Sequence, residues 1–168
     1  MSPNHRPPEP APRPIGPAGF FTGVKLRPVI AGVIVDYVAT YVLGMVYLIV
    51  FYQKEFSEGG RTFEEAVEKA LDQMLSSPEG LLALGIIGAV GTALGGYVAG
   101  RLARAHEVKH GALVGLVSLI LGVLQASVTG QPIPLPYWYE LLAYIIAVPA
   151  GALGGYFARR EMPSRLSA

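Results

Sequence analysis

The sequence contains no cysteine among its 168 residues, which excludes a disulfide framework, a thiol nucleophile and a cysteine metal site. Charge is also scarce: 15% of the residues are Asp, Glu, Lys or Arg, against about 25% in a soluble domain. The net charge of +1 argues against nucleic acid as a partner, because such proteins need a concentrated basic surface. There is no Gly-x-Ser-x-Gly, His-Glu-x-x-His or phosphate-loop motif. The sequence therefore predicts no enzyme, no cofactor and no metal site.

Long apolar stretches make up most of what is present. The chain is 52% hydrophobic with a mean hydropathy of +0.44, and four stretches reach the length of about 20 apolar residues that crosses a bilayer. Backbone amides inside lipid must be satisfied within the segment, which requires helices. The sequence therefore predicts an all-α polytopic membrane protein, with one transmembrane domain over 28–160 and spans at about 28–52, 79–103, 110–129 and 137–158.

The segments outside the spans predict the orientation. Residues 1–27 hold seven prolines and read as a disordered tail, and 161–168 form a short C-terminal tail. Ten of the thirteen basic residues fall in these tails, at the ends of the spans next to them, or in the turn between spans two and three. Because basic residues collect on the inner side, both termini are expected in the cytoplasm, with the protein in a bacterial inner (plasma) membrane.

The loop between spans one and two predicts a short amphipathic helix over 62–76 on the extracytoplasmic side. Thr62 and Glu65 form a capping-box pattern, and Ser77 with Pro78 fits the start of span two. One face is apolar, and this face either lies flat on the membrane surface or packs over the spans. The other face is acidic, and is either simply solvated or a docking patch. The apolar residues are Phe63, Val67, Ala70, Leu71 and Met74, and the acidic residues are Glu64, Glu65, Glu68 and Asp72.

Glycines are concentrated within the spans, where each costs about 1 kcal/mol of helix propensity relative to alanine. Small residues let helices in lipid approach closely, so these glycines are expected to mediate helix packing. They are Gly32 and Gly44 in span one; Gly88, Gly91, Gly95, Gly96 and Gly100 in span two; Gly111, Gly115 and Gly122, with Ser118, in span three; and Gly151, Gly154 and Gly155 in span four.

Two segments resemble each other. "ALGGYVAGR" (93–101) and "ALGGYFARR" (152–160) are 59 residues apart and close spans that run in the same direction. The similarity fits two hairpins related by duplication, as in parallel repeats. It also fits independent use of one tight-packing motif, and both interpretations stay open.

Asp36 is the strongest functional lead. It lies about 12 Å into span one, counted from Pro28 at 1.5 Å per residue, and a carboxylate at such depth is a functional-site hypothesis by default. Gly32, Asp36, Thr40 and Gly44 recur every fourth residue, a row expected to face the bundle. Arg101 and His110 are the expected partners of Asp36. Either Asp36 binds and releases a proton or cation, or it forms a structural ion pair or hydrogen bond.

Two segments of the chain are similar to known proteins. These segments are "RPVIAGVIVDYVAT" in span one and "GGYVAGRLARAHEVKHGALVG" across spans two and three. In them the chain resembles small uncharacterised bacterial four-helix integral membrane proteins. The resemblance implies the fold and the bacterial inner membrane. It brings no activity and no catalytic residues.

Two functional classes follow for a chain whose surroundings are the lipid bilayer. The first is a non-catalytic membrane scaffold or accessory subunit, forming a homo-oligomer or joined to other membrane subunits; glycine-rich faces and few buried charges favour it. The second is a small proton- or cation-coupled transporter or channel that uses Asp36.

Overall fold

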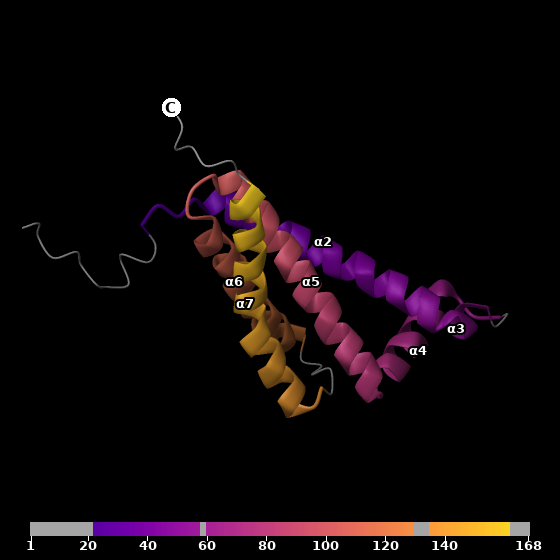
Figure 1. Cartoon of the computed structure of the whole chain (residues 1–168). Helices are drawn as coiled ribbons and strands as arrows, with labels where there is room; N and C mark the ends of the chain where they lie inside the picture. The colour runs from indigo at the N-terminus through magenta and orange to yellow at the C-terminus, as the bar shows by residue number, and fades with distance from the viewer. Residues whose placement is uncertain (1–21, 58–59, 130–134, 162–168) are drawn as a thin grey trace, which may run out of the picture.

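The computed structural model describes residues 22–57, 60–129 and 135–161, and over these residues the chain is helical with no strand. The predicted disordered N-terminal tail (1–27) lies outside this part up to residue 21, and its last two residues, Leu26 and Arg27, already belong to the first helix. Helix labels follow Figure 1. The helices are α2 (Leu26–Phe51), α3 (Gln53–Ser57), α4 (Phe63–Leu75), α5 (Pro78–Ala103), α6 (Glu107–Thr129) and α7 (Tyr137–Glu161).

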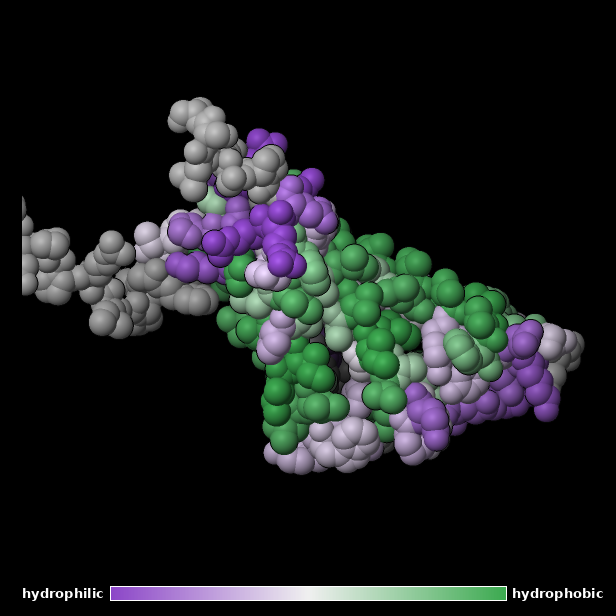
Figure 2. Space-filling model, viewed as in Figure 1, coloured by the Kyte–Doolittle hydropathy of each residue, from purple (hydrophilic) through white to green (hydrophobic). Residues whose placement is uncertain are grey.

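Four of these helices, α2, α5, α6 and α7, are long and apolar enough to cross a membrane. Polar residues gather at the two ends of the molecule, and the surface between them is apolar (Figure 2). Apolar side chains such as Ile34 and Leu82 lie exposed on this surface, as expected where lipid is the solvent. The prediction of an all-α fold with four helices long and apolar enough to span a membrane is confirmed.

The four long helices converge at one end and spread apart at the other (Figure 1). They converge at the α5–α6 turn, where the start of α2 and the end of α7 also lie; we call this the basic end, after Arg27, Arg101, Arg104, Arg159 and Arg160. The opposite end, which carries α3 and α4, we call the α4 end. Helix α5 packs against α2, α6 and α7.

Glycines occupy the close approaches in the converging half. A Cβ added at Gly32 of α2 would lie 2.6 Å from the carbonyl oxygen of Gly95 in α5. A Cβ at Gly96 or at Gly111 would collide with the carbonyl oxygen of Gly151 in α7. The atoms in the way are backbone atoms, which cannot rotate aside, so these helices meet backbone to backbone. Gly91, Gly100, Gly115, Gly154 and Gly155 also lie against a neighbouring helix.

Three glycines expected at helix contacts are not at one. Within the described residues nothing lies within 4 Å of a Cβ placed at Gly44, Gly88 or Gly122. Each of the three belongs to the half of its helix nearer the α4 end, where the helices have already diverged. These three glycines therefore contact no other helix of the described chain, since wheel position alone does not report how far apart two helices are.

Helix α4 fills the wedge between the diverging ends of α2 and α5. Ala70 and Met74 are buried against Leu48 of α2, with Ala83 and Leu84 of α5 beside them. The predicted apolar face is correct for these α4 residues. Phe63, which is 63% exposed, and Leu71 do not pack on the spans, while Ala66 is buried.

The wedge admits only a narrow stripe of α4, which explains why only part of the predicted apolar face is buried against the spans. The acidic residues Glu64, Glu65, Glu68 and Asp72 are exposed. The capping box of Thr62 with Glu65 is present, and the side chain of Ser77 caps α5 by accepting the Gly80 N–H. Both capping predictions are confirmed.

Candidate functional site

Asp36 lies near the middle of α2, about 15 Å from its first residue at 1.5 Å per residue. The residue is 5% exposed and faces α5. A Cβ at Gly91 would lie 3.1 Å from Asp36 Oδ1, and one at Gly95 would lie 2.9 Å from Asp36 Cβ. These two glycines therefore leave the space that the carboxyl group occupies.

Hydroxyl groups surround the carboxyl group. Thr40 Oγ1, one turn along α2, donates to Asp36 Oδ1 over 3.3 Å, and Thr92 Oγ1 of α5 lies 3.2 Å from both carboxyl oxygens. Ser118 Oγ of α6 also lies against this group. It is buried, and no partner lies at ordinary hydrogen-bond distance from it within the described part of the chain. Side chains from three helices thus converge on one acid.

The expected charged partners of Asp36 are elsewhere. Arg101 lies at the basic end, where its Nη1 is 3.8 Å from Glu161 Oε2 and its guanidinium lies over the ring of Tyr97. No ion pair within residues 22–57, 60–129 and 135–161 includes Asp36. The prediction that Arg101 lies with Asp36 and Thr40 is therefore wrong, because the Arg101 side chain lies with the other charges at the basic end.

His110 is fully buried, and it holds the start of α2 instead of contacting Asp36. Its Nε2 accepts the backbone N–H of Lys25 over 3.0 Å, and its Nδ1 lies 3.0 Å from the carbonyl oxygen of His106. An accepting Nε2 and a carbonyl opposite Nδ1 together require the neutral ring with its hydrogen on Nδ1. The Lys25 Nζ in turn donates to the Ala103 carbonyl at the end of α5. His110 therefore docks α2 onto α6.

A cavity of about 250 Å³ lies between α5, α6 and α7, in the half of the molecule nearer the α4 end. Gly85, Gly88 and Gly122 line it, which explains why two of these glycines contact no neighbouring helix. Thr92 and Ser118 also line the cavity, so the hydroxyls beside Asp36 form its floor. Sequence reasoning did not assign Thr92, although it lies about 16 Å from the end of α5 at 1.5 Å per residue, a depth matching that of Asp36.

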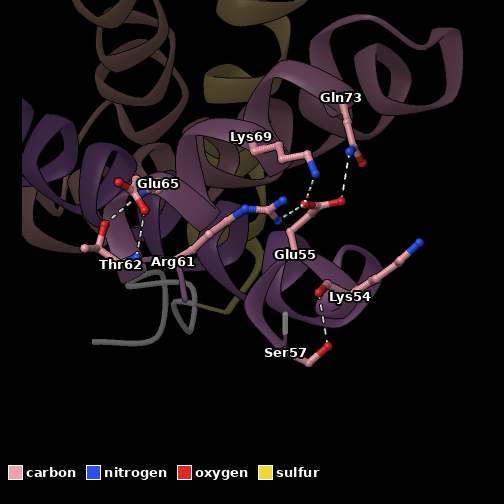
Figure 3. A network of polar contacts seen from close by, with 8 residues as sticks. All are labelled: Lys54, Glu55, Ser57, Arg61, Thr62, Glu65, Lys69 and Gln73. Carbon is pink, nitrogen blue, oxygen red and sulfur yellow. Dashed lines mark hydrogen bonds and ion pairs between the residues drawn. The ribbon is translucent and has the colours of Figure 1, made fainter. Parts of the chain in front are cut away.

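A second polar cluster lies outside the membrane-spanning helices, at the α4 end (Figure 3). Glu55 of α3 is 6% exposed. It forms ion pairs with Lys69 Nζ at 2.7 Å and Arg61 Nη1 at 2.8 Å, and accepts from Gln73 Nε2 over 3.0 Å. The hydrogen bond from Lys69, followed by that from Gln73, lowers the pKa of Glu55 below its ordinary value. This cluster ties α3 to α4, and it was not predicted.

Comparison of the chain with protein-family models, with curated proteins and with solved structures finds no match. The described residues also hold no group of three or more His, Asp or Glu side chains that could bind a metal ion. The function must therefore be argued from the geometry around Asp36.

Proposed function

We propose that Asp36 is a binding site for a proton or a small cation, and that the chain acts as a small proton- or cation-coupled transporter or channel. The observation that carries this proposal is the environment of the carboxyl group. It is buried among the hydroxyls of Thr40, Thr92 and Ser118, and it has no positively charged partner in the described part of the chain.

Hydroxyl neighbours suit an acid that changes its protonation state. A hydroxyl both donates and accepts hydrogen bonds, so Thr40 and Thr92 can donate to the ionised carboxylate and accept from the protonated acid. An arginine or lysine partner has only donors and favours the ionised form. Carboxylate and hydroxyl oxygens are also suitable ligands for a small hard cation.

The surroundings support a path to this site from one side. The cavity lies on the α4 side of Thr92 and Ser118, while toward the basic end Gly32 and Gly95 bring α2 and α5 into backbone contact. We propose that this glycine-mediated packing closes the bundle between Asp36 and the basic end. We further propose that both termini are cytoplasmic and that α3 and α4 lie on the extracytoplasmic side of a bacterial inner membrane.

Proton flux in liposomes tests the proposal. The purified protein is reconstituted with a pH-sensitive dye in the lumen, and flux is driven by a potassium diffusion potential. Wild type should carry flux above protein-free liposomes, and Asp36→Asn should abolish it because the amide cannot ionise. Glu140→Gln is the matched control, since Glu140 is an acid in the first turn of α7 that neither contacts Asp36 nor lines the cavity, and its removal should leave the flux unchanged.

Size-exclusion chromatography of each variant separates function from assembly. Loss of flux in an Asp36→Asn protein that elutes like wild type supports the proposal. If wild type carries no proton or sodium flux, or if Asp36→Asn retains it, the proposal is wrong.

An accessory-subunit role is the second candidate, and the position of α2 favours it. This helix packs mainly on α5 and exposes Ile34 and Tyr41, with Gly44 open on the same helix. Another membrane helix could therefore pack there. Because the chain has no cysteine, Ile34→Cys can report such a contact by disulfide cross-linking in native membranes. A cross-linked species supports this second function, and its absence argues against it.

A further inference from the structure

The cavity above Asp36 has the form of a ligand site, with an apolar wall and a polar floor. Its wall includes Leu84, Leu119, Leu142 and Ile146, and its floor is Thr92 with Ser118. Its volume of about 250 Å³ exceeds the roughly 150 Å³ that suffices for benzene in a protein core. A molecule with one aromatic ring and a short side chain therefore fits.

The cavity has an approach from the lipid side. A neighbouring hollow of about 150 Å³ shares Gly85, Tyr139 and Leu142 with it and extends to Leu82 and Trp138. Both of these outer residues are more than half exposed on the apolar surface. A recess between α5 and α7 is visible in Figure 2. A ligand could thus enter sideways from the bilayer, between these two helices.

The floor favours a hydrogen-bond donor. The hydroxyl proton of Thr92 is used in its bond to Asp36, which leaves the lone pairs of this oxygen to accept. Ser118 Oγ is buried beside the Asp36 carboxyl group with no hydrogen bond of ordinary length in the described chain, so its lone pairs are also open to a donor. Asp36 behind them adds an acid that no cation of the described chain neutralises. A protonated amine supplies both the donors and the positive charge.

We propose that this cavity binds a small amphiphilic amine. Its apolar body lies between α5, α6 and α7, and its ammonium group contacts Thr92 and Ser118 next to Asp36. This inference rests on the proposed function of Asp36 and names the class of molecule that the site takes.

Binding can be measured without a label because Trp138, the only tryptophan, lies beside the entrance. The protein in detergent micelles is titrated with 2-phenylethylamine while tryptophan fluorescence is followed, and 2-phenylethanol serves as the uncharged comparison. The amine should give a saturable change. The alcohol, and the amine with Asp36→Asn, should bind about tenfold or more weakly, the loss expected for a missing charge-assisted hydrogen bond.

Gly88→Leu is the decisive variant, since it fills the cavity at a position where nothing lies within 4 Å of a Cβ, so that the protein should still fold. It should abolish the saturable change. Gly44→Leu is the matched control, because Gly44 has equal space and lies on α2, which does not line the cavity; it should bind like wild type. A response that survives Gly88→Leu, an equal response to the alcohol, or no response in wild type would overturn the inference. If proton flux depends on Asp36 but the amine does not bind, this inference is wrong and the proposed function is still supported.

Discussion

Gly95→Ala should destabilise the bundle, whereas Gly88→Ala should not. The added methyl at Gly95 would collide with the carbonyl oxygen of Gly32 and lie 2.9 Å from Asp36 Cβ, so α2 would have to move away from α5. Overpacking of this kind costs about 1–3 kcal/mol. At Gly88 the same methyl meets nothing within 4 Å. Alanine raises helix propensity by about 1 kcal/mol at either position, and this gain cancels when the two variants are compared.

The difference in unfolding free energy between the two variants therefore isolates the collision, and we expect it to be about 1–3 kcal/mol. Titration of the protein in mild detergent micelles with dodecyl sulfate, followed by circular dichroism, measures this difference. Equal stability of Gly95→Ala and Gly88→Ala would refute the close contact of α2 with α5, since only one of the two methyl groups has an obstacle.

Two further predictions concern the polar contacts at the two ends of the molecule. The pKa of Glu55 in the folded protein is lowered from its ordinary value of 4.5. Its ion pairs therefore stabilise the α3–α4 cluster fully when the pH is above 4.5, and this stabilisation is lost as the pH falls through the lowered pKa of the folded state. At pH 5 pepsin should therefore cleave wild type near α3 more slowly than Glu55→Gln, and the two rates should converge as the pH falls; equal cleavage of the two at pH 5 would contradict this role. His110→Phe keeps a buried ring but leaves the Lys25 N–H without its acceptor, so it should cost about 1–3 kcal/mol in the same detergent titration. Unchanged stability would show that this hydrogen bond does not hold α2.

The four long helices could be predicted because the bilayer fixes both their length and their apolar character. The capping box at Thr62 could be predicted for a similar reason, since its pattern is local. In both cases a short stretch of sequence carries the whole physical signal.

The angles between the helices could not be predicted in this way. Tilt depends on packing against neighbours and not on composition, so the glycines that meet a helix, such as Gly95, looked like those that line a cavity, such as Gly88. The partners of Asp36 on other helices were missed for the same reason, whereas Thr40, one turn along the same helix, was predicted. Thr92 and Ser118 are ordinary small residues until three helices bring them to one carboxyl group.

Infrared difference spectroscopy of the lipid-reconstituted protein can detect directly whether Asp36 exchanges a proton or cation inside the membrane. Across a pH series, wild type and Glu140→Gln should show a carboxylic-acid C=O band that converts to carboxylate bands as the pH rises, and Asp36→Asn should lack this band. A spectrum in which the conversion persists in Asp36→Asn, or in which wild type shows no carboxyl group that depends on Asp36, would contradict the account.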